Sequence, residues 1–314
     1  MTLPCPKSGQ GLEAVSLNMR VLILGAGAGG GLPQWNCGCR NCNAARSGDI
    51  PSMTQSSIAV SADGQSWALI NASPDLRQQL GAQAKLYPQG LRGSPLGAVL
   101  VTNGDIDHIA GLLTLRESQA FDLFATPAIH DVLAANPIFS AMNPAHVTRK
   151  RVALDQDFVP LAGLELRLFA VPGKVPLYLE GESVQTDLMG ENTVGVEMRA
   201  NGKRAYYIPG CADVPEWLQQ RVQGADLLMF DGTLWSDDEM IRDGLGQKTG
   251  RRMGHVPVSG QGGSLNAFDG ADIGRRLYIH MNNSNPLTDP RSDESALAQA
   301  AGWTVARDGM EITL

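Results

Sequence analysis

Hydrophobic residues fall along this chain in short runs and alternating patterns, which are typical of β-strands rather than long helices. Two pairs of runs predict hairpins, one around Ala62–Gln65 and the other around Asn201-Gly202, a strong turn signal. The predicted strands are Arg20–Leu24, Ser56–Val60, Ser66–Ile70, Ala98–Val101, Leu123–Ala125, Glu165–Val171, Val194–Arg199, Lys203–Ile208, Asp226–Phe230 and Leu277–His280.

Helical patterns are fewer and shorter than the strand patterns. Gly111–Glu117 and Thr126–Phe139 have helical spacing, the second with Pro127 near its start. A further helix is predicted where Ser73 can act as N-cap and Pro74 occupies the first helical position. The pattern therefore predicts many strands connected by turns and short helices.

Length and composition restrict the class of protein. The chain has 314 residues, of which 43% are hydrophobic and 36 are glycine, so a substantial core and many tight turns are expected. The formal net charge of −7 argues against nucleic acid as a partner, because phosphate binding needs clustered positive charge. No apolar run approaches the roughly 18 residues of a membrane helix, and residues 1–18 lack the apolar core of a signal peptide. We expect a cytoplasmic protein without membrane insertion, with a disordered extension over residues 1–18 and a single domain over residues 19–314.

A glycine-rich segment, Gly25–Gly31, follows the first predicted strand. Its letters satisfy the Gly-x-Gly-x-x-Gly pattern of dinucleotide-binding proteins, but that motif requires a helix whose amino end cradles the pyrophosphate. Pro33 and a group of cysteines follow instead, so a regular helix cannot start there. We expect these glycines to let the backbone approach a neighbouring element or a ligand closely.

Three cysteines lie close together at Cys37, Cys39 and Cys42. In a reducing compartment this spacing favours a metal over a disulfide. Zinc is the usual ion, and it would require a fourth ligand from elsewhere in the chain. The alternative interpretation is three unrelated buried thiols.

An acidic residue and a histidine stand side by side after strand 98–101. The strand breaks at Asn103-Gly104, and Asp107 and His108 precede a segment of helical spacing. A carboxylate and an imidazole at a strand end commonly hold a divalent metal, although an N-capped turn gives the same letters. His280 ends another apolar strand and is a third candidate ligand.

His130 and His146 are not predicted to bind the metal. Neither has an acidic or cysteine neighbour at ligand spacing, and we expect both at the surface.

The loop around Asp107 and His108 resembles the signature of the metallo-β-lactamase superfamily, His-x-His-x-Asp-His with a glycine three residues on. Gly111 matches that glycine, whereas Asn103 and Asp105 stand where the first two histidines belong. The resemblance implies that one half of a two-metal centre is dismantled and that the other half is kept.

Other positions extend this resemblance. Pro172–Pro176 contains no histidine where relatives place a further ligand, and Cys211 stands where they carry a bridging aspartate. Asn71 replaces an aspartate that usually supports the metal loop. A strand-terminal histidine is the last ligand of the superfamily, and His280 holds that place.

The remaining donors, Asp107, His108 and His280, suggest the chemistry. Two histidines and one carboxylate that leave coordination positions open are associated with mononuclear non-haem Fe(II) oxygenases. A hydrolytic two-metal centre needs ligands for both ions. Ligand loss therefore favours Fe(II) and redox chemistry, whereas zinc in the same three ligands would be hydrolytic or inert.

Eight stretches, read in order, resemble a narrower family. They are GAGAGGGLPQWNCGC, TQSSIAV, NASPDLRQQL, TNGDIDHIAGLLTLRE, PGKVPL, FDGTLW, TGRRMGH and IHMNNSNP. They are similar to the B-protein family of pyrroloquinoline quinone (PQQ) biosynthesis, from about Met19 to Leu314. The resemblance implies an α+β fold, a metallo-β-lactamase-like αββα sandwich with two mixed β-sheets packed face to face and helices outside. It also implies a role in making the redox cofactor from a Glu-Tyr pair cut out of a precursor peptide.

Three functions remain open. The chain hydroxylates the tyrosine ring at an iron centre, carries PQQ or its precursor towards the periplasm, or acts as a metal-dependent hydrolase. An open-sided metal triad favours hydroxylation, because a carrier has no need of it. The expected partner is a small-molecule or dipeptide precursor of PQQ, and a homodimer is left open.

Further site residues follow from the same resemblance. His255 and Asp231 are assigned to catalysis, where they would orient substrate or move protons, and Thr233 is assigned to substrate binding. A glutamate-bearing substrate needs a cation, for which the candidates are Lys174, Arg251 and Arg252.

The resemblance also bears on the zinc site. Related phosphodiesterases complete the cysteine site with a histidine three residues after the last active-site ligand. Asn283 holds that position here. Asparagine is a rare zinc ligand, so the identity of the fourth donor stays open.

Overall fold

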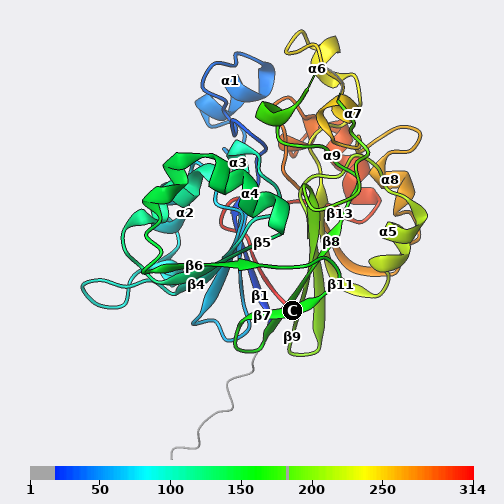
Figure 1. Ribbon diagram of the computed structural model, residues 1–314. Helices are drawn as coiled ribbons and strands as arrows, with labels where there is room; N and C mark the ends of the chain where they lie inside the picture. The colour runs from blue at the N-terminus through cyan, green and yellow to red at the C-terminus, as the bar shows by residue number, and fades with distance from the viewer. Residues whose placement is uncertain (1–17, 182–183) are drawn as a thin grey trace, which may run out of the picture.

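Two seven-stranded β-sheets pack face to face, and helices cover their outer surfaces (Figure 1). The computed structural model describes residues 18–181 and 184–314, so the extension expected over residues 1–18 falls, except for its last residue, outside the described residues. Each sheet contains both parallel and antiparallel pairs. The predicted sandwich of two mixed sheets is therefore confirmed.

The first sheet has the strand order β14-β1-β2-β3-β4-β5-β6. Its strands are β1 (Arg20–Gly25), β2 (Ser57–Ser61), β3 (Trp67–Ile70), β4 (Leu96–Leu100), β5 (Phe121–Ala125), β6 (Val147–Arg151) and β14 (Glu311–Thr313). The second sheet has the order β13-β12-β11-β10-β9-β8-β7. Its strands are β7 (Asp157–Leu161), β8 (Leu164–Ala170), β9 (Val194–Ala200), β10 (Lys203–Ile208), β11 (Ala225–Asp231), β12 (Ile273–Ile279) and β13 (Trp303–Val305).

The helices are short, as the sequence predicts. They are α1 (Arg40–Ser47), α2 (Leu76–Gly81), α3 (Ile106–Ile109), α4 (Pro127–Ala135), α5 (Glu216–Arg221), α6 (Glu239–Arg242), α7 (Gly250–Met253), α8 (Ser264–Ala267) and α9 (Asp293–Ala300). Single 3-10 segments are η1 (Ala84–Leu86), η2 (Ala110–Arg116), η3 (Pro137–Ala141), η4 (Leu177–Leu179) and η5 (Pro286–Thr288).

All three predicted helices differ in detail from the structure. The segment expected to be helical over Gly111–Glu117 forms the 3-10 helix η2 over Ala110–Arg116. The helix expected over Thr126–Phe139 ends at Ala135, because Pro137 cannot continue it, and a 3-10 turn follows. The helix expected to begin at Pro74 begins at Leu76 with Asp75 as its N-cap residue. The Ser73 side chain instead accepts a hydrogen bond from the Asp75 amide in the turn before the helix.

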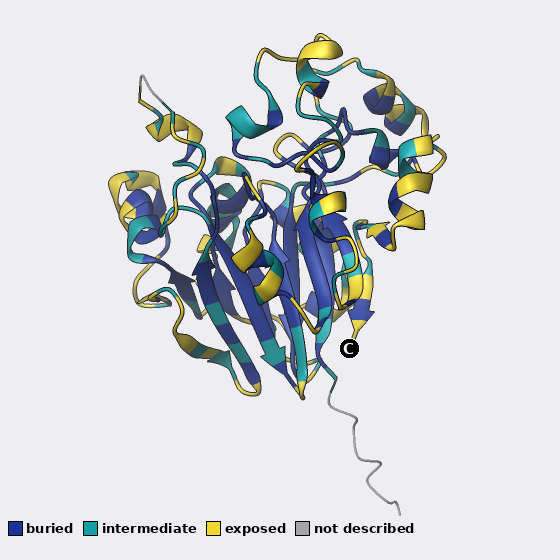
Figure 2. Ribbon diagram, turned by 90° about the vertical axis from the view of Figure 1, so that its right-hand side faces the viewer, coloured by how far each residue is buried: buried dark blue, intermediate teal, exposed yellow. Residues whose placement is uncertain are grey.

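Alternation along the strands of the first sheet divides their side chains between two clusters. Val21 and Ile23 of β1 belong to the core between the sheets, whereas Leu22 and Leu24 pack in a second cluster with residues of α2, η2 and α4. Successive side chains of a strand point to opposite faces, so β1 contributes to both clusters. Figure 2 shows the resulting buried interior (dark blue) beneath exposed outer helices.

Loops at one edge of the sandwich bring the two sheets together. The backbone of Gly27, after β1, forms bridges with Gln55 and with Met281, which follows β12. A Cβ on Gly25 would lie 2.1 Å from the Gln55 carbonyl oxygen, so that position requires glycine. No helix starts before α1 in this segment, and the close-approach interpretation of the glycines is confirmed.

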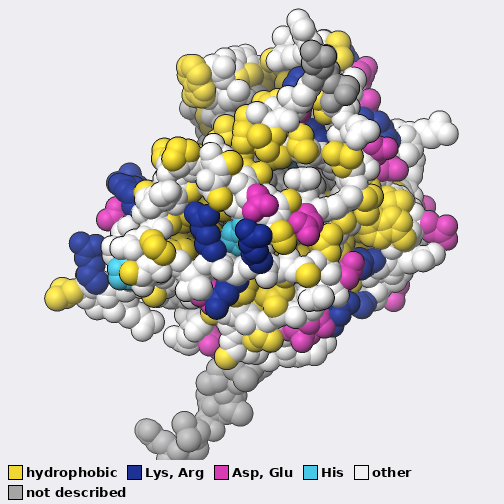
Figure 3. All heavy atoms as spheres, in the orientation of Figure 1, with side chains coloured by type: hydrophobic (Ala, Val, Ile, Leu, Met, Phe, Trp, Pro, Cys, Tyr) yellow, Lys and Arg dark blue, Asp and Glu magenta, His cyan; other side chains and the backbone are white. Residues whose placement is uncertain are grey.

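Edge strand β6 carries exposed basic side chains. Residues 148–151, which include Arg149, Lys150 and Arg151, are exposed. Figure 3 shows several Lys and Arg side chains on this face of the molecule. Charged side chains on an edge strand discourage pairing with another sheet.

Candidate metal site and its cavity

The loop after β4 places Asp107 and His108 in the first turn of α3. The loop is held against the end of β3 by two backbone hydrogen bonds, from the Ala72 amide to the His108 carbonyl and from the Gly111 amide to the Ala72 carbonyl. A Cβ on Gly111 would lie 2.1 Å from the Ser73 carbonyl oxygen. The glycine three residues after His108 therefore allows the metal loop to pack directly on its neighbour.

The Asn71 side chain braces the beginning of this loop. Its Oδ1 accepts a hydrogen bond from the Thr102 amide at 2.9 Å, and its Nδ2 donates to the Thr102 hydroxyl at 3.0 Å. Asn71 is fully buried and adopts a left-handed backbone with φ of 64°. An uncharged amide therefore provides the bracing expected at this position.

Three candidate ligands from two sheets converge. The Nε2 atom of His280 lies 3.0 Å from Oδ2 of Asp107, and Nε2 of His108 lies 3.8 Å from the same oxygen. One donor atom from each of the three residues lies within 4.8 Å of the others. Asp107 and His280 are 173 positions apart, so only the packing of the two sheets brings them together.

Asn103 determines the orientation of His108. Its Oδ1 accepts a hydrogen bond from the Asp105 amide, so the same oxygen must also accept from Nδ1 of His108, at 2.8 Å. The proton of the imidazole therefore lies on Nδ1, and Nε2 carries a lone pair. This Nε2 is buried and has no hydrogen-bond partner among the described residues, which fits a metal ligand.

The protonation states suit a cation. Burial lowers the pKa of His108 to about 4, so the ring is neutral at pH 7. Burial opposes ionisation of Asp107, but at the low pH where this carboxyl titrates the positive charge of protonated His108 and a hydrogen bond from protonated His280 outweigh it and hold its pKa well below the usual range. The set therefore offers a carboxylate at Asp107 and a neutral imidazole at His108. Burial alone would lower the pKa of His280, but the hydrogen bond and the charge of Asp107 outweigh it and raise that pKa, so His280 must release a proton when it binds metal.

Asn103→Ala is expected to weaken metal binding about 10- to 100-fold, because it removes the acceptor that orients His108. Competition with a chelator measures the affinity. Asn103→Asp keeps an acceptor oxygen and should retain more of the affinity. An alanine variant that binds metal like the unchanged protein would contradict this role.

A second group of polar residues contacts the His280 ring on its Nδ1 side, away from Asp107. The Thr233 hydroxyl donates to Oδ1 of Asp231 at 2.6 Å and lies 2.9 Å from Nδ1 of His280. Because the hydroxyl proton points at the carboxylate, its lone pair accepts from Nδ1 and leaves Nε2 of His280 facing Asp107. Thr233, predicted to bind substrate, thus has its hydroxyl engaged with Asp231 and His280. His280 itself has φ of 61°, a conformation uncommon outside glycine.

His255 lies beside His280 with the rings stacked at a centroid distance of 5.2 Å. Its Nδ1 is 2.7 Å from Oδ2 of the fully buried Asp231. Asp231 therefore fixes the ring, and Nε2 is left for a ligand, since His255 lines the cavity in front of the metal site. This arrangement suits proton transfer.

The structure also shows the surroundings of Cys211 and His130, which lie outside the triad. The Cys211 thiol is buried, donates to the Asp213 carbonyl at 2.9 Å and has its pKa raised by burial, which describes an inert thiol. His130 is buried as well, with Nε2 2.9 Å from the Lys150 carbonyl oxygen. The expectation of a surface position for His130 was wrong, because its helix packs that face on the first sheet.

The cavity in front of the triad has a volume of about 330 Å³. Loop residues near Gly29, the segment from Lys174 to Glu180 and the segment from Lys248 to His255 contribute to its walls. Of the three predicted substrate-binding cations, Lys174 lines the cavity, whereas Arg251 and Arg252 are not among its described lining residues. Lys248, which the sequence did not single out, lines it too.

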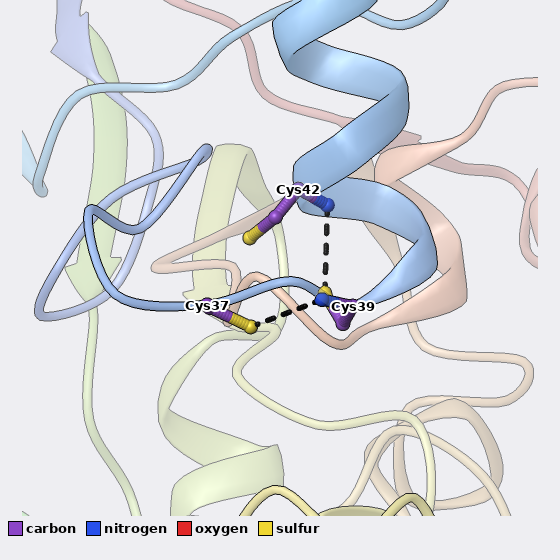
Figure 4. Close-up of side chains that lie close together, drawn as sticks. All are labelled: Cys37, Cys39 and Cys42. Carbon is purple, nitrogen blue, oxygen red and sulfur yellow. Dashed lines mark hydrogen bonds between the residues drawn. The ribbon is translucent and has the colours of Figure 1, made fainter.

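The three cysteines gather around the start of α1 (Figure 4). Their sulfur atoms lie within 4.8 Å of one another, and Nδ2 of Asn283 is 3.1 Å from Cys37, 3.6 Å from Cys39 and 3.3 Å from Cys42. Asn283 thus stands where a fourth donor is needed. A 180° flip of its side-chain amide would direct Oδ1 instead of Nδ2 towards the sulfur atoms. Burial raises the pKa of Cys39 to about 11, so this thiol would need a bound cation to be held as a thiolate at neutral pH.

Comparison with known proteins agrees with this geometry. Residues 66–281 match the family model described as "Beta-lactamase superfamily domain". A diphosphatase from the PhnP family has a TM-score of 0.65 at 20% identity, covering 95% of this chain and 97% of that one, which shows a shared fold alone. The fold and its site define a member of the metallo-β-lactamase superfamily, with a His/Asp donor set suited to metal-dependent activity.

Closer relatives narrow the family. The chain is 59% identical to coenzyme PQQ synthesis protein B of Ruegeria pomeroyi, over 94% of this chain and all of that protein, and 53% identical to that of Rhizobium meliloti, over 95% and 98%. The crystal structure of Zn(2+)-bound PqqB from Methylobacterium extorquens has a TM-score of 0.93 at 52% identity, over 94% of this chain and all of that one. The chain belongs to the coenzyme PQQ synthesis protein B family, and its role lies in PQQ biosynthesis.

Over residues 18–181 and 184–314, no helix combines the length and apolar character that crossing a bilayer requires.

Proposed function

We propose that this chain is a mononuclear non-haem iron hydroxylase that acts on the tyrosine ring of a Glu-Tyr-derived PQQ precursor. The main observation in support is the group of three donors, Asp107, His108 and His280. These residues also line the cavity, so a metal bound by them would keep open coordination positions facing it. Two imidazoles and one carboxylate with open positions suit ferrous iron.

The residues that replace the missing ligands support a single ion. Oδ1 of Asn103 is engaged with His108, and Oδ1 of Asp105 accepts from the Leu177 amide at 3.3 Å. Asn103 thus orients His108, and Asp105 joins the metal loop to the segment that begins at Leu177. A two-metal hydrolase needs ligands at these places to hold the ion that stabilises the attacking or leaving oxygen.

Ferrous iron, when bound, supplies the activation of O₂ that hydroxylation of a phenol requires. One oxygen atom enters the ring in place of hydrogen, the other leaves as water, and an external reductant supplies two electrons with two protons. His255 holds or moves a proton at Nε2, because Asp231 fixes its other nitrogen. The apolar side chains of Leu177 and Met253 line the same cavity and suit an aromatic ring.

Metal exchange tests the proposal. Apoprotein loaded with Fe(II) and given the dipeptide Glu-Tyr and ascorbate should consume O₂ and form a product heavier by one oxygen atom. The same protein loaded with Zn(II) should do neither. Consumption with zinc alone, or none with iron, would contradict hydroxylation.

The other two functions predict different results in the same experiment. Binding of precursor or PQQ without any product would favour a carrier. Cleavage of the Glu-Tyr bond by the zinc form, independent of O₂, would favour a hydrolase.

A further inference from the structure

The cations expected to receive a substrate carboxylate are mostly occupied by the protein itself. Glu180 takes two of them: its Oε1 lies 2.9 Å from Nζ of Lys174 and its Oε2 lies 3.1 Å from Nη2 of Arg252. Nη1 of Arg251 lies 3.7 Å from Oδ1 of Asp213 and Nη2 donates to the Gly262 carbonyl. These three side chains hold the walls of the cavity in place.

Lys248 is different. It is half-buried, lines the cavity and has neither an ion pair nor a hydrogen bond with any described residue. Its position is nevertheless well defined, because the next residue, Thr249, caps α7 by accepting from the Arg252 amide, and the Gly250 amide donates to the Asp237 carbonyl. A fixed backbone thus presents an uncompensated ammonium group at the cavity wall.

The charges of the cavity make Lys248 the group that remains without a counter-ion. Three carboxylates and two lysines line the cavity: Asp105, Asp107, Glu180, Lys174 and Lys248. Glu180 neutralises Lys174 through their ion pair. A divalent ion in the triad balances the two aspartates. Counted over the acidic and basic side chains that line it, the metal-loaded cavity would then carry one surplus positive charge, which favours an anionic ligand, and Lys248 is the lining lysine without a counter-ion among the described residues.

We propose that Lys248 binds a carboxylate of the ligand whose phenol ring lies at the metal. The ligand class is an amino acid or dipeptide with one aromatic and one acidic end, and the inference rests on the proposed function for the identity of that ligand. Met253 and Leu177 line the same cavity and offer apolar contacts to the aromatic ring of such a ligand.

Binding to the zinc-loaded protein tests this role without turnover. Calorimetry compares Glu-Tyr with Gln-Tyr and with Glu-Tyr amide, each of which lacks one carboxylate. Lys248→Met should weaken binding of Glu-Tyr at least about tenfold, the usual effect of losing a hydrogen bond between charged groups. Lys248→Arg should keep most of the affinity. Lys203→Met, which removes a lysine paired with Asp226 elsewhere on the second sheet, should bind like the unchanged protein.

The analogues identify the carboxylate. The unchanged protein should lose affinity for one of the two amide analogues, and Lys248→Met should no longer distinguish that analogue from Glu-Tyr. Equal affinity of the unchanged protein and Lys248→Met for Glu-Tyr would overturn the role of Lys248 and leave the proposed function intact. No binding of Glu-Tyr to the unchanged protein would overturn both. Lys248→Gln repeats the comparison should the methionine variant fold poorly.

Discussion

His108→Ala is expected to remove the active-site metal ion and O₂-dependent turnover, while the ion held by the cysteines remains. The variant lacks one of the three metal donors. Its metal affinity should therefore fall by more than the 10- to 100-fold expected when only a residue that hydrogen-bonds a ligand is removed. Metal analysis of the purified variant should show one ion fewer per chain than the unchanged protein. O₂ uptake with Glu-Tyr should fall to background.

His130→Ala is the matched control for this variant. His130 is also a buried histidine, so its replacement leaves a similar cavity in the fold, but it belongs to none of the donor groups found in the described residues. It should lower stability without changing metal content. Full metal content and turnover in His108→Ala would show that the triad is not the metal site.

Cys42→Ser is expected to lose the second metal ion and to destabilise the protein by on the order of 4 kcal/mol, as loss of a structural metal does. Cys42 is fully buried at the start of α1, and Asn283 joins its sulfur to the loop that directly follows His280. The cluster thus connects two loops that are distant in the sequence. In small metal-binding domains, loss of the metal at such a connection unfolds the domain. Thermal unfolding should shift downward by on the order of 10 °C.

Two further variants sharpen this test. Cys211→Ser changes a buried thiol outside the cluster and should leave the zinc content unchanged. Asn283→His supplies the nitrogen ligand that zinc prefers and should bind zinc about tenfold more tightly. A Cys42→Ser variant that keeps its full metal content would contradict a metal clip at this place.

Whether a strand could be predicted from the sequence depended on its position in the sheet. The sequence revealed strands such as β1 and β4, whose side chains are nearly all buried, and it missed β6, β7, β13 and β14. These four are the outermost strands of the two sheets. An edge strand is partly exposed on both faces, so its residues need neither a hydrophobic run nor an alternation.

Site residues divide in the same way. Asp107, His108 and His280 could be singled out because each stands at the end of an apolar strand, a local pattern. The partners of Arg251 and Arg252, and the lack of a partner for Lys248 among the described residues, could not be predicted. An ion pair joins segments that are far apart in the chain, and the sequence does not tell which of them lie close together in space. Glu180 is separated from Arg252 by 72 positions, yet the two form an ion pair, whereas Lys248 has no partner among the residues that the structure describes.

The spacing of residues along the chain by itself predicted the many short strands and the group of three cysteines, whereas the two-sheet sandwich and the set of three candidate metal ligands were inferred from the resemblance to a known family. Only the tertiary structure decided which polar groups are satisfied: Asn103 by His108, Thr233 by Asp231 and Glu180 by two cations. The physical reason is that a buried polar group without a partner is costly, and the partners available to it are set by how the two sheets pack.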